Sequence, residues 1–295
     1  MIKFRVPATS ANLGPGFDCL GVAFDLYNTF LIEGSDTLEI NGVEERFNNA
    51  DNLFVQAYRR AGGKNLKVTF CDTEIPVSRG LGSSAALITA GVTAYHLLHP
   101  DTLTEEEMFN IIADMEGHPD NAAPCLFGGL VGCLKKADGT YLHTSFPVND
   151  HFCFTVLIPN VEVSTEQARK ILPMQYSREI TASSSAQAVF MLKALQSGDS
   201  NMLKEAAKDQ IHEPYRKTLI PHFDDLKTIV ENDTGGVLLI SGSGSTCLLI
   251  SAKPLSKKAC EAISVLPEKW RIKETRPAYG GPERETDGIW HPVLQ

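Results

Sequence analysis

Residues 76–86, with the sequence PVSRGLGSSAA, form a glycine-rich loop that could bind an anion. Gly80 and Gly82 permit positive φ angles, and Ser83 and Ser84 are good N-cap residues for the apolar helix predicted after them. The first N–H groups of a helix lack partners and carry the positive end of its dipole, so the loop predicts a phosphate site. It is not a Walker A loop, because no Gly-Lys-Ser/Thr follows the glycines. The alternative is a tight turn before a core helix.

A second segment, residues 7–18, places an amide and a carboxylate on a stretch shaped by proline and glycine. It follows a predicted strand and is itself predicted to be irregular, so Asn12 and Asp18 could face a ligand. The alternative is a surface turn in which these two side chains only bond to their own backbone.

A third segment, Glu116–Pro124, brings a carboxylate, an imidazole and an amide to the end of one helix and the start of the next. Asp120 or Asn121 is expected to cap the second helix. That assignment leaves Glu116 and His118 free to face a ligand.

Two arginines in the second half could bind an anionic group. Arg169 lies on the first turns of a helix that begins near Ser164, and Arg216 ends the polar segment 209–216. For both, a solvated helix face is the alternative. Residues 241–245 form a second glycine-rich turn between apolar strands, which could line a ligand or be a simple turn.

Composition indicates a soluble globular chain with room for one large or two ordinary domains: 295 residues, 43% hydrophobic and 21% charged. No apolar run approaches the roughly 18 residues of a membrane helix, and the N-terminus resembles no signal peptide. The 7 cysteines include no C-x-x-C pair, so neither a zinc site nor a disulfide framework is indicated and a cytoplasmic location is expected. The net charge of −9 argues against a nucleic-acid surface.

Two αβ halves, divided near residue 150, are predicted to position these side chains around one cleft. Predicted strands span residues 4–8, 22–31, 38–40, 66–71, 130–134, 152–158, 237–240, 246–250 and 270–275. Predicted helices span residues 51–61, the stretch after the glycine loop, 104–115, 121–127, 165–171, 184–196, 222–232 and 255–264. Asp51 is expected near one cap, and the T-E-E-E sequence at Thr104 is a strong helix start. The last ten residues are expected to form a loosely attached tail.

In their order along the chain, these motifs resemble those of the GHMP small-molecule kinases. The matching stretches are Thr9–Asp18, Gly80–Ala86, His118-x-x-Asn121-x-x-Pro124 and Ser241–Ser245. The forms Glu-Gly-His-Pro-Asp-Asn and Thr-x-x-Ala-Arg resemble the homoserine kinases of that superfamily, and the resemblance covers essentially the whole chain. It implies an α+β fold with two domains: a ribosomal-protein-like αβ domain over residues 1–150 and a ferredoxin-like αβ domain over residues 151–295.

The resemblance implies transfer of the γ-phosphoryl group of ATP to the side-chain hydroxyl of L-homoserine, giving O-phospho-L-homoserine for threonine synthesis. The implied acceptor site comprises Asn12, Asp18, His118, Asn121, Arg169 and Arg216. An amino-acid zwitterion needs both charges matched, and the two arginines suit its carboxylate while the aspartate suits its ammonium. The amides and the imidazole would orient the hydroxyl.

The resemblance also implies sites for ATP and Mg²⁺. The implied phosphate-binding residues are Pro76, Val77, Ser78, Arg79, Gly80, Leu81, Gly82, Ser83, Ser84, Ala85 and Ala86. Ser84 and Glu116 match the family's Mg²⁺ ligands, Thr165 lies near the γ-phosphate, and Asn52 lies near the adenine. Only one residue separates Glu116 from His118, fewer than in other homoserine kinases, so Asp114 and residues 105–107 are alternative metal ligands.

No dedicated base is assigned, although catalytic roles are expected for Asp18, His118, Asn121 and Thr165. Galactokinase-like and mevalonate kinase-like members have a catalytic aspartate where this chain has Asn121, and an amide cannot accept a proton. The proton would go to Asp18, His118, water or the phosphate. Phosphoryl transfer depends mainly on alignment and charge neutralisation, which favours positioning without a base.

Three other functions compete with this hypothesis. A kinase for a related amino-acid alcohol such as L-threonine differs by one methyl group, a small discrimination. A non-catalytic nucleotide-binding or interaction protein would have lost the phosphate loop or the metal ligands, and both are intact. An RNA-binding module would suit the ribosomal-protein-like half, but the charge opposes it. The expected partner is a small molecule rather than a nucleic acid or membrane, and a homodimer is expected from the family.

Overall fold

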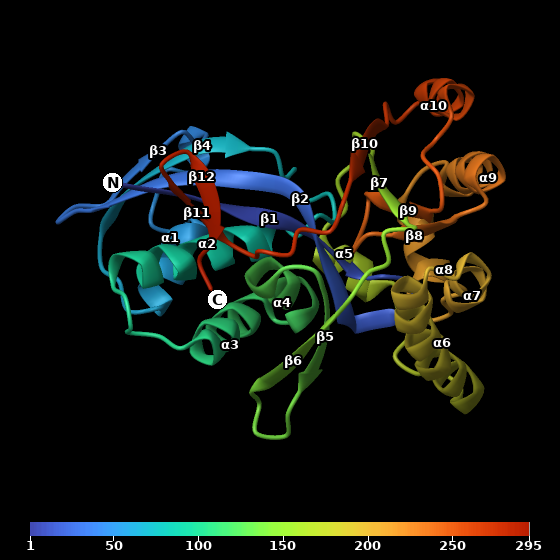
Figure 1. Cartoon of the computed structure of the whole chain (residues 1–295), viewed down its shortest axis with the longest axis horizontal. Coiled ribbons are helices and arrows are strands. Elements are labelled where there is room, and N and C mark those ends of the chain that lie inside the picture. Colours follow the sequence, from blue (N-terminus) through green and yellow to red (C-terminus); the bar gives the residue numbers. More distant parts are fainter. Residues whose placement is uncertain (295) are drawn as a thin grey trace.

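A computed structural model describes residues 1–294, which form two αβ halves lying side by side (Figure 1). The first half contains an eight-stranded sheet in the order β12-β11-β1-β2-β4-β3, with β5 and β6 joined to it through β2. Its strands are β1 (Ile2–Asn12), β2 (Gly16–Gly34), β3 (Glu39–Asn41), β4 (Leu66–Thr73), β5 (Leu130–Lys135), β6 (Tyr141–Phe146), β11 (Glu283–Thr286) and β12 (Ile289–Pro292).

Four helices pack beside this sheet (Figure 1). They are α1 (Leu53–Arg60), α2 (Ser83–Leu98), α3 (Glu105–Glu116) and α4 (Pro119–Phe127), with a 3-10 turn at Glu45–Phe47. The capping box predicted at Thr104 is confirmed: its side chain accepts from the backbone of Glu107, whose side chain accepts from the backbone of Thr104. The apolar helix predicted after the glycine loop is α2, which is almost continuously buried from Ala85 to Ala94.

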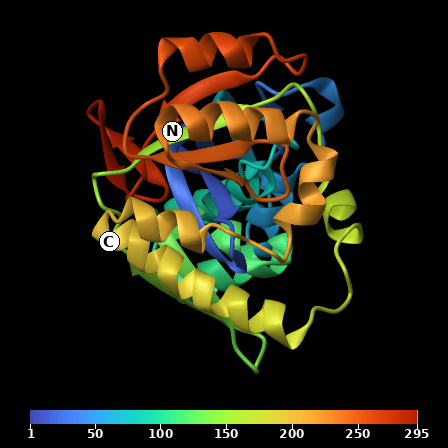
Figure 2. The same cartoon turned by 90° about the vertical axis from the view of Figure 1, so that its right-hand side faces the viewer.

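The second half is built on a four-stranded antiparallel sheet in the order β10-β7-β9-β8. Its strands are β7 (Cys153–Ile158), β8 (Val237–Ile240), β9 (Cys247–Ser251) and β10 (Arg271–Thr275). Its helices are α5 (Thr165–Lys170), α6 (Arg178–Ser197), α7 (Ser200–Ala206), α8 (Glu213–Arg216), α9 (Phe223–Thr234) and α10 (Lys257–Ser264), with a 3-10 turn at Lys217–Leu219. Figure 2 shows α9 and α10 together on the outer side of this sheet.

The predicted two-domain α+β fold is confirmed, including the ferredoxin-like second sheet. One face of that sheet packs Leu238 and Leu249 against α9 and α10. Its other face contributes Val156, Leu239 and Leu248 to the core that also contains the first sheet. The two halves therefore share apolar core, which fixes the groups lying between them.

The segment at residues 7–18 is mostly strand, so the prediction of irregular structure is wrong. β1 runs to Asn12 and β2 starts at Gly16, which leaves only a short turn between them. The register shifts between Pro7 and Ala8, and again between Ala11 and Asn12. These irregularities accommodate a proline that cannot donate to the ladder, and they allow positive φ angles at the strand end.

The expectation of a loose tail is also wrong for the residues that the structure describes; Gln295 lies outside them. β11 and β12 form a hairpin that pairs with β1. The guanidinium of Arg5 lies 3.9 Å from the Tyr27 ring centre and 4.4 Å from that of Trp290, and 2.6 Å from the Glu283 carboxylate. These contacts hold the hairpin on the first sheet, so the chain returns to its first half after building the second. The domain boundary near residue 150 stays a prediction.

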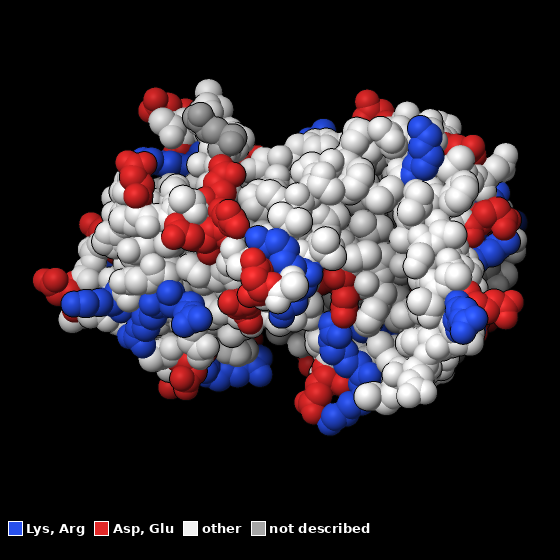
Figure 3. Space-filling model, turned by 90° about the horizontal axis from the view of Figure 1, so that it is seen from below, with Lys and Arg blue, Asp and Glu red and all other residues white. Residues whose placement is uncertain are grey.

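Short elements account for the other differences. β6, α7 and α8 were not predicted, and α6 begins at Arg178 rather than at residue 184. β6 exposes most of its side chains, so its hydrophobic pattern is weak. No helix within residues 1–294 is long and apolar enough to cross a membrane. Acidic and basic side chains are interspersed on the face that Figure 3 shows.

Candidate active site

A cavity of about 860 Å³ lies between the two halves, and most of the predicted site residues line it. This volume is typical of small-ligand sites. The predicted residues that line it are Asn12, Asp18, Asn52, Pro76, Val77, Ser78, Arg79, Gly80, Gly82, Ser83, Ser84, Glu116, His118, Asn121, Thr165, Arg169 and Arg216. The second glycine-rich turn contributes Gly242 and Ser243 to the lining. Of the two alternatives for this turn, a ligand-lining segment or a simple turn, the structure agrees with the first.

The glycine loop has the geometry of an anion site. Within the described part of the chain, no backbone N–H from Val77 to Ala85 donates to a protein acceptor. Ser78, Gly80 and Gly82 have positive φ angles of 54°, 76° and 66°. Alternating left-handed residues turn successive N–H groups inward, which forms a concave nest for an anion. The N-terminus of α2 adds its dipole.

Ser83 and Ser84 are not N-caps, contrary to the prediction. The N-cap of α2 is Gly82, in a left-handed conformation and without a side-chain hydrogen bond. No serine oxygen therefore satisfies the first N–H groups of the helix. The absence of a capping side chain leaves these donors available to a ligand.

The second half of the chain holds the loop in place. The backbone N–H of Thr246 donates to the carbonyl of Arg79 at 2.9 Å, and the Ser241 hydroxyl donates to the carbonyl of Gly80 at 2.5 Å. The Arg79 side chain donates to the carbonyl of Pro159 and pairs with Glu162 at 3.2 Å. Arg79 is therefore partly engaged in holding the two halves together.

Three residues of the loop do not offer side chains to the cavity. Leu81, Ala85 and Ala86 are buried in the core. The backbone N–H of Ala86 donates to the carbonyl of Gly82, as the first hydrogen bond of α2. Ala86 therefore has neither a free donor nor an exposed side chain for the phosphate contact that was predicted.

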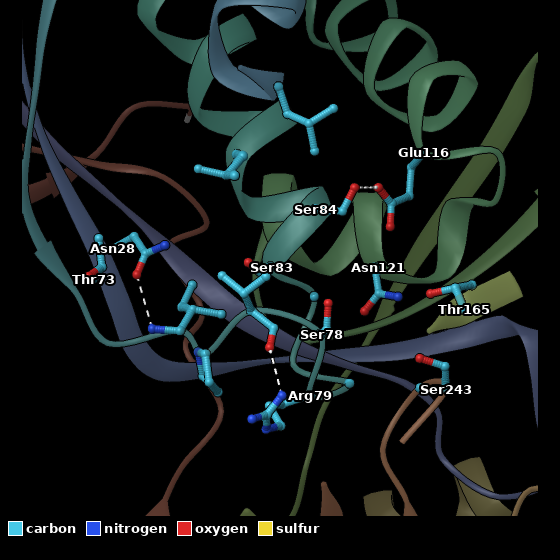
Figure 4. Close-up of a pocket in the computed structure, with 18 of the residues that line it drawn as sticks. Asn28, Thr73, Ser78, Arg79, Ser83, Ser84, Glu116, Asn121, Thr165 and Ser243 are labelled. Atoms are coloured by element: carbon cyan, nitrogen blue, oxygen red, sulfur yellow. Dashed lines mark hydrogen bonds between the residues drawn. The ribbon is translucent and has the colours of Figure 1, made fainter. Parts of the chain in front are cut away.

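Ser84 and Glu116 face each other across the cavity wall, where the Ser84 hydroxyl donates to the Glu116 carboxylate at 2.7 Å (Figure 4). Burial raises the pKa of Glu116, partly offset by this hydrogen bond and by His118. A cation bound nearby would therefore stabilise the ionised form of this carboxylate. Two adjacent oxygens fit Mg²⁺, which usually binds one or two protein carboxylates and takes further ligands from phosphate and water.

The alternative metal ligands are less well placed. Neither Asp114 nor residues 105–107 line the cavity, and Glu107 is committed to the capping box of α3. Within residues 1–294, no group of three or more His, Cys, Asp or Glu side chains could hold a metal by itself. The oxygen pair beside the glycine loop is therefore the arrangement that suits a phosphate-bound cation.

Asp120 is a functional candidate that the sequence reasoning treated only as a cap. Neither it nor Asn121 caps α4, because the N-cap is His118 and no side-chain cap bond is present. The Asp120 carboxylate is 2% exposed and lies 2.8 Å from His118 Nδ1. Burial lowers the pKa of His118, but Asp120 and then Glu116 outweigh it, and the net pKa is raised. The position of Asp120, two residues after His118 at a helix start, was the available signal.

Asn121 and Thr165 face the same space as the loop (Figure 4). The Thr9 hydroxyl donates to Asn121 Oδ1 at 2.7 Å, whereas its Nδ2 has no protein acceptor in the described chain. This amide nitrogen can donate to a ligand oxygen but cannot accept a proton. Thr165 starts α5, whose N-cap Ser164 accepts from the backbone of Gln167.

The charged members of the predicted acceptor site that come from the two halves, Asp18, Arg169 and Arg216, also bind protein groups. Arg169 donates to Asp18 through two nitrogens, at 3.1 and 2.8 Å. Arg216 is buried and donates to the carbonyls of Ala168 and Gly242, at 3.2 and 2.8 Å. Burial and then the charge of Arg169 lower the pKa of Arg216 to about 10.

Phe17, absent from the prediction, lies beneath both arginines. Its ring centre is 5.7 Å from the guanidinium carbon of Arg169 and 5.1 Å from that of Arg216. An aromatic face attracts cations, so this ring favours two like charges in close proximity. Asn12 braces the same corner, since Nδ2 donates to the carbonyl of Gly242 and Oδ1 accepts from the backbone of Asp18.

Asn52 also lines the cavity, and its side chain has structural partners. It caps α1 by accepting from the backbone of Phe54 at 3.0 Å, so Asp51 lies next to the cap, as predicted. Its amide nitrogen donates to the carbonyl of Phe47. Apolar side chains that the prediction did not include also line the cavity: Val43, Phe47, Leu53, Phe70, Ile75 and Leu87. They form a lining suited to a flat aromatic base.

Comparisons with known proteins identify the family of the chain. Two family models, described as GHMP kinases N terminal domain and GHMP kinases C terminal, match residues 51–129 and 191–267. The fold and these two family models thus define a GHMP kinase.

The chain is 37% identical over 282 residues to a homoserine kinase of Clostridium beijerinckii, covering 92% of this chain and 94% of that protein. A homoserine kinase of Clostridium botulinum is 34% identical over 286 residues, 94% of this chain and 96% of the relative. The crystal structure of homoserine kinase from Cytophaga hutchinsonii superposes with a TM-score of 0.84 at 28% identity, covering 96% and 97% of the two chains. The chain belongs to the homoserine kinase family of the GHMP kinases.

Proposed function

We propose that this protein is a homoserine kinase, which transfers the γ-phosphoryl group of ATP to the side-chain hydroxyl of L-homoserine. The observation that carries the proposal is the composition of one cavity. An unpaired N–H nest and an oxygen pair suited to Mg²⁺ lie at one part of it, and groups of both charges suited to an amino-acid zwitterion lie at another.

The glycine loop would bind the triphosphate through the backbone N–H groups of residues 77–85, with the dipole of α2 behind them. Ser84 and Glu116 would hold Mg²⁺, which neutralises charge on the phosphates when bound. Thr165 would approach the γ-phosphate from the other half. The apolar lining near Asn52 would take the base.

Asp18, Arg169 and Arg216 would bind the amino-acid end of the acceptor. The aspartate would pair with the ammonium, and the guanidinium groups would donate to the carboxylate. The Arg216 Nη2 has no protein acceptor within residues 1–294, so it can serve a ligand while the other nitrogens hold the backbone. The amino-acid end of the substrate would thereby be fixed before reaction.

His118 and Asn121 would orient the reacting hydroxyl, with Asp120 and Thr9 positioning them. The Asp120 carboxylate keeps the proton of the neutral imidazole on Nδ1, which leaves Nε2 as an acceptor. Asn121 would donate through Nδ2. Alignment rather than strong base catalysis suits a loose phosphoryl-transfer transition state.

A coupled ADP-release assay with Mg-ATP tests the proposal. Turnover is expected with L-homoserine and far less with L-threonine, mevalonate or galactose. Equal or better turnover of any of these three would refute the substrate assignment and keep the fold. Omission of Mg²⁺, followed by its restoration, tests the metal requirement separately.

The proposal extends to the cellular location and the oligomeric state of the protein. We expect a cytoplasmic enzyme, supported by 7 cysteines that all lie unpaired. The homodimer stays a prediction, and sedimentation analysis of the purified protein would decide it.

A further inference from the structure

Asp18 and Arg169, which were predicted to bind opposite charges of the acceptor, form an ion pair with each other. The Arg169 guanidinium donates to both oxygens of the Asp18 carboxylate. Asp18 lies on β2 of the first half, and Arg169 lies on α5 of the second half, 151 residues away. Their side chains are 35% and 39% exposed, so solvent and ligands can reach the pair.

A second guanidinium, that of Arg216, lies close to this pair. Arg216 forms no ion pair within the described chain, and it lies over the same Phe17 ring as Arg169. Asp18 has a positive φ of 56°, a conformation that a non-glycine residue adopts at some energetic cost. Its backbone N–H donates to Asn12 Oδ1, and the residue lines the cavity.

We propose that the Asp18–Arg169 ion pair is a latch that only a ligand carrying both an ammonium and a carboxylate opens efficiently. A zwitterion replaces the pair with two new ones, ammonium with Asp18 and carboxylate with Arg169 and Arg216. A ligand of one charge must break the same pair and leaves one member unpaired. The inference rests on the proposed function, because it takes the amino-acid end of the acceptor to lie in this corner.

The latch makes the two charges of the acceptor bind cooperatively. Each charge alone competes with an internal counter-ion already in place, whereas both together exchange one ion pair for two. The protein's own ion pair thus discriminates against hydroxyl compounds that lack either group. Differences of this kind arise from interactions unfavourable to the wrong ligand as much as from attraction to the right one.

Two fragments of the acceptor test the latch: 4-hydroxybutanoate, which lacks the ammonium, and 3-aminopropan-1-ol, which lacks the carboxylate. Their dissociation constants would be measured by ligand-observed NMR titration without nucleotide. Asp18→Asn releases Arg169, so 4-hydroxybutanoate should bind about two- to fivefold more tightly than to the unaltered protein, the range expected for an exposed pair. Arg169→Gln should do the same for 3-aminopropan-1-ol. Both variants should bind L-homoserine more weakly.

Glu166→Gln is the matched control, because Glu166 lies on the same helix and pairs with Lys170 rather than with the latch. It removes one negative charge and should leave both fragments unchanged. If Glu166→Gln strengthens the binding of 4-hydroxybutanoate as much as Asp18→Asn does, the loss of one negative charge from the protein explains the effect. The latch is then not responsible and the proposal is refuted. The proposal is also refuted if neither Asp18→Asn nor Arg169→Gln binds its fragment more tightly than the unaltered protein does. If one of these variants fails to fold, the other variant provides the test.

These outcomes differ from failure of the proposed function. If the unaltered protein releases no ADP with L-homoserine, the assigned substrate is wrong. If it turns over L-homoserine normally but neither variant gains affinity for its fragment, only the latch is wrong.

Discussion

Gly82→Ala tests whether the glycine loop is a built site or an ordinary turn. Gly82 has a φ of 66°, and a Cβ there would collide with the Thr9 hydroxyl and come within 3.2 Å of Asn121 Oδ1. A left-handed alanine costs about 1–2 kcal/mol. If Thr9 rotates away, its buried hydroxyl loses the 2.7 Å hydrogen bond to Asn121, which costs about 1–3 kcal/mol more.

The sum, about 2–5 kcal/mol, should lower Tm by roughly 3–8 °C, because the unfolding entropy scales with the 295 residues of the chain. The KM for ATP should also rise, because the displaced Cβ and hydroxyl alter the first turn of α2. Thermal unfolding and initial-rate kinetics at varied ATP would measure both effects.

Gly139→Ala is the control for the conformational cost alone. Gly139 has a φ of 91°, and a Cβ there would meet nothing within 4 Å. It should destabilise by only about 1–2 kcal/mol and leave the KM for ATP unchanged. If Gly82→Ala is no more damaging than this control and binds ATP normally, the account of a tightly fitted loop is incorrect.

Three further predictions concern charged groups. Glu116→Gln should raise the Mg²⁺ concentration for half-maximal activity by about tenfold, because one charge-assisted contact is lost, and Tm should stay nearly unchanged. A normal Mg²⁺ titration would contradict the metal assignment. Asp120→Asn removes the main group that raises the pKa of His118, so the acid limb of the kcat/KM profile should move to lower pH, and an unmoved limb would exclude His118 as the titrating group. Burial raises the pKa of Glu213 from 4.5 to about 7, although Lys227 lies 3.1 Å away. As pH rises, Glu213 loses its proton in the unfolded chain before it does so in the folded protein. The free energy of unfolding should therefore fall by about 2–3 kcal/mol between pH 4.5 and 7. In urea unfolding, Glu213→Gln should make the free energy of unfolding depend less on pH over this range.

Local features of this chain were predictable because they depend on neighbouring residues. The capping box at Thr104 and the helix after the glycine loop required only spacing and side-chain type. The N-cap of α2 was misassigned because serine preference is an average, whereas Gly82 adopts the left-handed angle that the loop requires. The tail was misread because its hairpin is stabilised by β1, almost the whole chain away.

The candidate site divides in the same way. The residues in the ordered motifs were sufficient to indicate a phosphate loop and a metal-binding Ser and Glu, and the structure places Ser84 beside Glu116. Ala86 was included because a motif does not reveal which N–H groups the helix itself uses. Asp120 was passed over because burial beside His118 is invisible to sequence.

By itself, the sequence determined the family, the position of the glycine-rich loop and the two-half architecture of this protein, since spacing, glycine conformation and helix signals act over a few residues. Only the tertiary structure decided that Asp18 and Arg169 pair, that Phe17 lies beneath two arginines, and that burial sets the pKa of Glu116. The physical reason is that charge, burial and hydrogen bonding at the site depend on groups more than a hundred residues apart, which become neighbours only when the two halves pack together.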